Sequence, residues 1–285
     1  MTRLLPILAV VVAIVALWYA GAVWMNAQWE RDQAERAGVE ITFAEILPKT
    51  MAQERPMLPA PQQVAAEIWK TVFETAPTSK RSLVFHGWVT LSATLVGFGL
   101  GTALGVVLAV AIVGSRTTGL SVMPWIVASQ TVPILAIAPM MIVVLNAMNV
   151  SGLIAKASIS AYLSFFPVTV GMVKGLRSPG AMELDLMRTW NASKAQTFLK
   201  LRFPASLPYL FASMKVGVAA SLVGAIVAEM TLSQAGGLGA RLLNGSYYGQ
   251  TMMIWAALIA AALMAGLLVP LIGLIERLAT KGRPA

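Results

Sequence analysis

Long apolar runs separated by short polar segments dominate this chain of 285 residues. A helix needs about 20 predominantly apolar residues to cross the hydrocarbon core of a bilayer. Six runs come close to that length and are predicted to be membrane-spanning helices. They cover residues 4–24, 88–113, 124–147, 152–173, 209–230 and 252–275. The pattern therefore predicts an all-α membrane protein with about six transmembrane helices.

The first apolar run has two interpretations. Arg3, the run itself and the small residues Ala20, Gly21 and Ala22 resemble a cleaved signal peptide. The run is 21 residues long, however, whereas the apolar region of a signal peptide has about 7–15 residues. An uncleaved transmembrane anchor over residues 1–25 is therefore favoured.

The segment that follows, residues 26–87, is polar and carries mixed charge. Within it, residues 62–75 place Val64, Ile68 and Val72 at i, i+4 and i+8, which is typical of an amphipathic helix. We expect this helix to lie along the outer membrane surface.

A basic loop at residues 174–208 separates two of the predicted spans. It contains six Lys and Arg residues against two acids, Glu183 and Asp185. Because Lys and Arg resist translocation, a short basic loop is expected on the cytoplasmic side. With six spans, the same side receives both termini and eleven of the 21 Lys and Arg residues. These eleven are Arg3, Arg116, Lys174, Arg177, Arg188, Lys194, Lys200, Arg202, Arg277, Lys281 and Arg283.

The loop is patterned as two short helices. Met182, Leu186 and Trp190 recur at i, i+4 and i+8 and form one apolar stripe. Asn191 follows, and Asn is second to Gly at the left-handed position that ends a helix. Ser193, followed three residues later by Gln196, fits a capping box at the start of a second helix.

That second helix is predicted to run through Leu201 and to end at Pro204. Two hypotheses fit the pair of helices. A basic amphipathic hairpin can lie on anionic lipid, or a helical knob can enter a cleft on a cytoplasmic protein. Two opposed helices joined by a capped turn favour the knob.

Prolines interrupt several predicted spans. Pro133, Pro139 and Pro167 each free a backbone carbonyl about one turn earlier. Freed carbonyls are tolerated where they line a wet cavity, and broken helices often mark a substrate path. Kinks needed only for packing are the alternative. Gln130 and Thr131 beside Pro133 favour a path at that point.

Glu229 is the only acidic residue inside a predicted span. An acid within a span usually faces the interior of the helix bundle. Because Glu229 lies near the end of its span, a structural ion pair or helix-end contact is favoured over a role in a gate along the path.

Gly97, Gly101 and Gly105 recur every four residues on one face of the second span. Small residues at this spacing let helix backbones approach closely. Packing within one chain is favoured over a seam between two chains.

Composition excludes several classes of protein. The chain is 58% hydrophobic and 12% charged, whereas soluble domains carry about 25% charged residues. It has no Cys and one His, His86, so a thiolate or histidine metal cluster is excluded. The net charge of +9 follows from membrane topology and does not indicate nucleic-acid binding. No phosphate-binding G-x4-G-K-[ST] loop and no catalytic constellation is present, so an enzyme is not predicted.

The basic loop resembles the EAA loop, EAA-x3-G-x9-I-x-LP, of the permease subunits of bacterial ABC importers. Asp185-Leu186-Met187 stands at the EAA position, Asn191 at the Gly, Leu201 at the Ile and Phe203-Pro204 at the LP. Further motifs resemble the nitrate/sulfonate/taurine-type subfamily in the same order along residues 56–280. They are Leu58-Pro59-Ala60-Pro61 with Val64, Thr131-Val132-Pro133 with Ala138-Pro139, Phe165-Phe166-Pro167, Ala228-Glu229-Met230 and Gly237-Leu238-Gly239.

The resemblance implies a type I importer permease with its core at residues 88–276, a coupling loop at 174–208 and a cytoplasmic tail at 277–285. Residues 26–87 would then be periplasmic, and the protein would lie in the bacterial inner membrane. Ten loop residues would contact the ATPase: Met182, Glu183, Asp185, Leu186, Met187, Trp190, Asn191, Ser193, Leu201 and Pro204. Six would belong to the translocation path: Gln130, Thr131, Pro133, Pro139, Pro167 and Glu229.

The implied partners are separate ABC ATPase subunits, a periplasmic solute-binding protein and a second copy of this chain in a homodimer. The ATPase subunits would bind ATP, so no cofactor is expected in this chain. The subfamily handles sulfonates, taurine, nitrate and vitamin-related heterocycles. Because the centres of the spans lack basic residues, we expect an aromatic heterocycle such as a pyrimidine or riboflavin in preference to a sulfonate-like anion. A secondary, ion-coupled transporter is the alternative, but the internal repeats and paired ionisable residues it predicts are not found.

Overall fold

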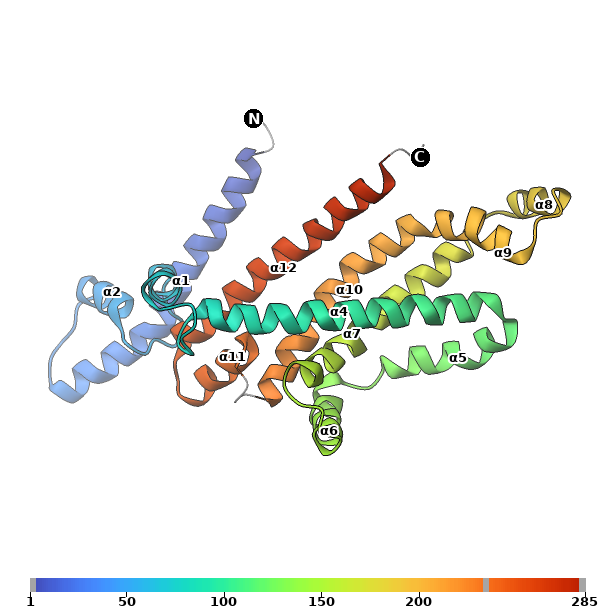
Figure 1. The fold of residues 1–285 in the computed structure, drawn as a ribbon. Coiled ribbons are helices and arrows are strands. Elements are labelled where there is room, and N and C mark those ends of the chain that lie inside the picture. Colours follow the sequence, from blue (N-terminus) through green and yellow to red (C-terminus); the bar gives the residue numbers. More distant parts are fainter. Residues whose placement is uncertain (1–3, 233–235, 282–285) are drawn as a thin grey trace. The chain divides into compact units, whose positions relative to one another are not determined.

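The computed structural model describes residues 4–232 and 236–281, and every regular element in them is helical (Figure 1). Arg3 and Arg283, both predicted to be cytoplasmic, lie outside these residues. The elements are α1 (Leu4–Ala37), α2 (Phe43–Ala52), α3 (Pro61–Trp69), η1 (Lys70–Glu74), α4 (Leu83–Gly114), α5 (Arg116–Ser129), α6 (Ile134–Ala147), α7 (Leu153–Leu176), α8 (Ala181–Thr189), α9 (Lys194–Thr197), η2 (Phe198–Arg202), α10 (Phe203–Thr231), α11 (Leu238–Tyr247) and α12 (Thr251–Thr280). The prediction of an all-α chain is confirmed.

Five helical segments in the described residues are long and apolar enough to cross a membrane. They are α1, α4, α7, the continuous segment Lys194–Thr231 and α12. A sixth span exists only if α5 and α6 count together, and these two helices meet at an angle of 103°. The predicted span over residues 124–147 is therefore divided between two helices, the first of which already begins at Arg116.

Pro133 explains the break between α5 and α6. Proline has no N–H to continue a helix, and it disfavours helical backbone in the residue before it. The backbone amides of Gln130 and Thr131 donate to the carbonyls of Val127 and Ala128, three residues back, which ends α5. Pro133 is the N-cap residue of α6. Figure 1 shows α6 turned away from the line of α5.

Two further boundaries differ from prediction. The first helix continues to Ala37, well beyond residue 24. The second helix of the basic loop does not end at Pro204 but runs into α10. A wider π-helical turn precedes this proline, in which the Phe203 amide bonds the Phe198 carbonyl five residues back. Because Pro204 lies in the first turn of α10, where amides need no partner within that helix, its missing N–H is tolerated.

The chain divides into two compact units. The first comprises residues 1–87 and 241–260. In it, the buried side chain of Asn26 on α1 holds the extended segment before α3. Its amide donates to the Leu58 carbonyl at 2.8 Å and its oxygen accepts from the Met57 amide at 2.8 Å. The Trp18 indole donates to the Pro59 carbonyl at 3.0 Å. The proline-rich segment is thus fixed to α1.

The predicted amphipathic helix over residues 62–75 is present as α3 and η1. Val64 is buried in the first unit, and Ile68 and Val72 are half-buried. Trp69 and Phe73, on another face, are exposed, and their rings contact each other with centroids 4.5 Å apart and planes inclined by 41°. The segment therefore has a second, exposed apolar surface in addition to the predicted stripe of Val64, Ile68 and Val72.

The second unit comprises residues 88–240 and 261–285. Within it, α7 packs closely against both α4 and α10 through small residues. A β-carbon at Gly101 of α4 would lie 2.0 Å from the Ser164 hydroxyl oxygen of α7. A β-carbon at Gly175 of α7 would lie 2.8 Å from the Cα of Ser206 of α10. Gly97 and Gly105 approach α7 in the same way as Gly101, so the prediction of close packing within one chain is confirmed.

Candidate functional site

The loop between α7 and α10 begins with a clear break between two helices. The helix α7 ends at Leu176, and α8 begins after Gly180. The Glu183 carboxylate accepts a hydrogen bond of 2.8 Å from the Gly180 amide. An acid in the first turn satisfies a free amide and interacts favourably with the helix dipole. Glu183, a predicted loop residue, therefore stabilises the start of α8.

Asn191 ends α8 as the sequence predicted. Its φ is 51°, which is left-handed. The Asn191 amide donates to the Arg188 carbonyl at 2.9 Å, and the Ala192 amide donates to the Met187 carbonyl at 3.0 Å. These two bonds form a Schellman motif.

Ser193 starts the next helix through the predicted capping box. Its hydroxyl accepts a hydrogen bond of 3.2 Å from the backbone amide of Gln196. The side-chain oxygen of Gln196 accepts one of 2.8 Å from the backbone amide of Ser193. The turn between α8 and α9 is therefore held from both sides by defined hydrogen bonds.

The apolar stripe of α8 is uncovered. Met182, Leu186 and Trp190 are 87%, 50% and 71% exposed. Asp185 and Arg188 form an exposed ion pair of 2.8 Å beside this stripe. No residue of α8 is buried. The helix therefore presents an apolar face that no other described part of the chain covers.

The rest of the loop joins two membrane helices. Met187, Leu201 and Pro204 are half-buried. The Arg202 guanidinium donates to the Leu176 carbonyl at 3.2 Å, which ties the beginning of α10 to the end of α7. From the sequence, Arg202 was predicted to have only a topological role, because nothing in its spacing indicates which helix end it reaches.

The predicted path residues are distributed over four places, of which the end of α10 with Glu229 is described below. Gln130, Thr131 and Pro133 share the turn between α5 and α6, and the Thr131 hydroxyl donates to the Ala128 carbonyl at 2.8 Å. Pro139 lies inside α6, and Pro167 lies inside α7. The structure thus gathers the first three residues but does not join them to the two other prolines.

Glu229 is fully buried at the end of α10. Its Oε2 accepts from the Thr90 hydroxyl at 2.8 Å and from the Gly239 amide at 3.0 Å. The Lys156 ammonium lies 4.0 Å from the other carboxylate oxygen. Glu229 therefore has both the ion pair and the helix-end contact that were favoured for it.

The same network fixes the backbone that leads into α11. The Thr90 hydroxyl accepts from the Leu238 amide at 2.8 Å, and Lys156 donates to the Gly236 carbonyl at 2.8 Å. A β-carbon at Gly237 would lie 2.0 Å from the Glu229 carboxyl carbon. Thr90 and Lys156 were not predicted as partners of Glu229, because both lie on helices remote from it in the chain.

Comparison with known proteins decides the family. Residues 101–282, which include the loop, the α5–α6 break and Glu229, match the family described as "Binding-protein-dependent transport system inner membrane component". This chain belongs to that family. It is therefore a permease with the type I ABC importer fold.

Three relatives support this assignment. The permease is 30% identical to a "probable ABC transporter permease protein" of Haemophilus influenzae, over 71% of this chain and 78% of the relative. It is 29% identical to a formylaminopyrimidine transport permease of Halalkalibacterium halodurans, over 69% of this chain and 71% of the relative. It is 30% identical to a riboflavin transport system permease of Chloroflexus aurantiacus, over 78% of this chain and 79% of the relative.

A further ion pair of the permease involves an acid just beyond a predicted span. Glu276 follows the predicted span over residues 252–275 but lies inside α12, which extends to Thr280. Glu276 accepts a hydrogen bond of 2.5 Å from Lys215 of α10. The pair is partly exposed and lies near the α12 terminus, where charged groups cost less than at mid-membrane.

Proposed function

We propose that this permease forms the solute path of an ATP-driven importer and that residues 174–208 receive motion from separate ATPase subunits. The observation that carries the proposal is the exposed stripe of Met182, Leu186 and Trp190 on α8. A short helix with an apolar face and defined ends suits the groove of a protein partner. Trp is also the residue type most often found as an anchor at such contacts.

The connection from the loop to the membrane core supports mechanical coupling. The helical segment Lys194–Thr231 contains 38 residues without a break. At 1.5 Å per residue it is about 57 Å long. It begins in the loop and carries Glu229 near its other end. A displacement of the loop would therefore act directly on the helix that holds the buried carboxylate.

The orientation follows from charge. The loop, Arg116 and Arg277 would face the cytoplasm, together with both termini, because Lys and Arg resist translocation. The segment before α4 would face the periplasm and a solute-binding protein. Two copies of the chain would form a homodimer around the path, each with one ATPase subunit.

We place part of the path at the break between α5 and α6. Gln130, Thr131 and Pro133 lie in this break, and irregular backbone at membrane depth is tolerated where it lines a cavity. Pro139, Pro167 and Glu229 are further candidates, on α6, α7 and α10.

We propose a small aromatic heterocycle as the solute. Two of the relatives at about 30% identity are named for formylaminopyrimidine and riboflavin, both of which contain pyrimidine rings. A sulfonate-like anion is the second candidate within the subfamily. The binding protein would supply most of the selectivity.

Reconstitution tests this function against the alternative of a secondary transporter. The permease, an ABC ATPase subunit that copurifies with it and a solute-binding protein are placed in proteoliposomes with radiolabelled solute. We expect uptake only when ATP and all three proteins are present. Uptake by the permease alone under an ion gradient, with no effect of ATP, would establish the secondary transporter instead.

A further inference from the structure

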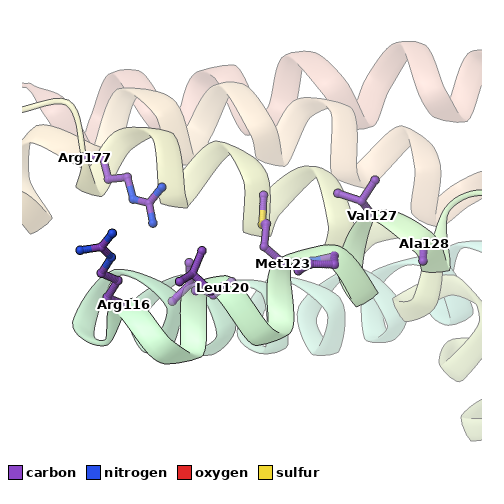
Figure 2. Close-up of a pocket in the computed structure, with 9 residues that line it drawn as sticks. Arg116, Leu120, Met123, Val127, Ala128 and Arg177 are labelled. Carbon is purple, nitrogen blue, oxygen red and sulfur yellow. The ribbon is translucent and has the colours of Figure 1, made fainter.

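A cavity of about 700 Å³ lies along α5 in the second unit. Its wall combines the end of α4, most of α5 and the residue that caps α7. Figure 2 shows the labelled side chains along it: Arg116, Leu120, Met123, Val127, Ala128 and Arg177. The path proposed above does not use this cavity.

One end of the cavity is cationic. Figure 2 shows the guanidinium groups of Arg116 and Arg177 pointing toward each other across that end. Both side chains are exposed, and within residues 4–232 and 236–281 neither forms an ion pair with a carboxylate. Arg116 is also the first residue of α5, where the positive end of the helix dipole adds to its charge. This arrangement favours an anion that both guanidinium groups can contact.

The rest of the wall is apolar. Leu120, Met123, Val127 and Ala128 follow Arg116 along one side of α5, and Ile112 of α4 lies buried behind them. From Leu120 to Ala128 the helix rises about 12 Å. Half of the hydrocarbon core of a bilayer is about 15 Å thick. The apolar wall therefore covers most of the depth of one leaflet of acyl chains.

We propose that this cavity binds one anionic diacyl phospholipid, with its phosphate between Arg116 and Arg177 and an acyl chain along α5. Guanidinium groups bind phosphate oxygens through charge-assisted, often bidentate hydrogen bonds. Basic sites between membrane helices commonly hold lipid headgroups on the cytoplasmic side. A free phosphate would satisfy the arginines but would leave the apolar wall in contact with water.

A second copy of this chain is the competing occupant. A symmetric contact uses the same surface on both copies. It would bring two further arginines toward Arg116 and Arg177 without supplying a carboxylate, which is unfavourable for like charges. Charge therefore favours the lipid, and this inference does not depend on which solute the permease carries.

Native mass spectrometry of the full-length permease tests the proposal. The protein is purified from nanodiscs made of equal parts phosphatidylglycerol and phosphatidylcholine and is then progressively delipidated. We expect about one phosphatidylglycerol retained per chain. The Arg116→Gln/Arg177→Gln double variant should lose this retention about tenfold, whereas Arg188→Gln, which removes a charge from exposed α8, should not.

A second pair of variants tests the apolar wall with both arginines intact. Val127→Trp fills the far part of the cavity and should release the lipid. Val143→Trp, at an exposed position of α6 outside the cavity, is the matched control and should retain it. Size-exclusion chromatography checks that each variant is folded.

Three results would overturn the proposal. Equal retention of both lipids would show that charge does not select the occupant. Displacement of the bound lipid by inorganic phosphate would identify a small-anion site.

The third result comes from cross-linking. Because the chain has no cysteine, Leu120→Cys introduces a unique thiol. Efficient disulfide formation between two such chains in membranes would show that a second copy covers the face.

Discussion

The hydroxyl of Thr90 donates a hydrogen bond of 2.8 Å to the carboxylate of Glu229, which is 139 residues away in the chain. Both side chains are fully buried, and the same hydroxyl accepts from the Leu238 amide. One oxygen atom therefore connects α4, the end of α10 and the start of α11. The hydroxyl gives the buried carboxylate one of its hydrogen-bond donors, which matters because burying a charged group is costly unless it is hydrogen-bonded and paired.

Replacing this hydroxyl should destabilise the permease. Thr90→Val keeps the shape of the side chain but removes a donor from Glu229 and an acceptor from the Leu238 amide. We expect a loss of about 1–3 kcal/mol, as for other buried groups left unsatisfied. Thermal unfolding of the full-length protein in detergent measures it. Thr94→Val is the control, because the Thr94 hydroxyl donates to the Thr90 carbonyl of its own helix and, among the described residues, bonds no other helix. Equal effects of the two substitutions would contradict the role given to Thr90.

Two glycines of α4 provide a matched pair for helix packing. A β-carbon at Gly101 would lie 2.0 Å from the Ser164 hydroxyl oxygen and 2.8 Å from the Ala161 carbonyl oxygen. At Gly99 a β-carbon would meet nothing within 4 Å. Gly101→Ala should therefore separate α4 from α7 and lower the unfolding temperature. Gly99→Ala should be neutral or raise it, because alanine favours a helix by up to about 1 kcal/mol over glycine. The assay is the same unfolding measurement.

Asn191 should be replaceable by glycine but not by valine. Its φ of 51° suits glycine at no steric cost, whereas a β-branched side chain is strained there. Asn191→Gly should retain solute-stimulated ATP hydrolysis in the reconstituted system. Asn191→Val should reduce it severalfold while the protein remains inserted in the membrane. Full activity of the valine variant would show that the Schellman turn is not needed for coupling.

Trp190 and Leu186 test contact with the ATPase. Trp190→Ala should leave the permease inserted but weaken its association with the ATPase about thirtyfold, the equivalent of a hot spot of about 2 kcal/mol. Leu186→Asp should do the same by placing an unpaired charge in the groove. Copurification and ATPase activity are the measurements, and Arg188→Ala is the control on a neighbouring face. If both apolar substitutions left association unchanged, α8 would be a lipid-facing helix.

Topology can be mapped with single cysteines. Ser193 and Glu54 are both exposed in the structure. Ser193→Cys should react with an impermeant thiol reagent only from the cytoplasmic side, and Glu54→Cys only from the periplasmic side. Labelling of right-side-out and inside-out vesicles distinguishes them. Reversed labelling would exclude the cytoplasmic position of the loop.

Local signals in the sequence were sufficient for the fold class and for the form of the loop. Five of the six apolar runs coincide with helices long enough to cross a membrane, because such a helix must be apolar along most of its length. The end of α8 was predictable from Asn191 and the start of α9 from Ser193 with Gln196, because each cap involves residues at most five positions apart. The spacing of Gly97, Gly101 and Gly105 likewise predicted a close helix contact within the chain.

Only the tertiary structure determined the directions in which helices continue or bend and the contacts between residues remote in sequence. Nothing local indicated that the chain bends by 103° between α5 and α6, because a proline permits either a kink or a break. Pro204 was predicted to end a helix, yet a π turn allows that helix to continue into α10. Glu229 could be identified as a buried acid, but Thr90, Lys156 and Gly239 could not be named as its partners. Pairing of this kind requires helices to be placed side by side, and that placement is set by packing across the whole unit.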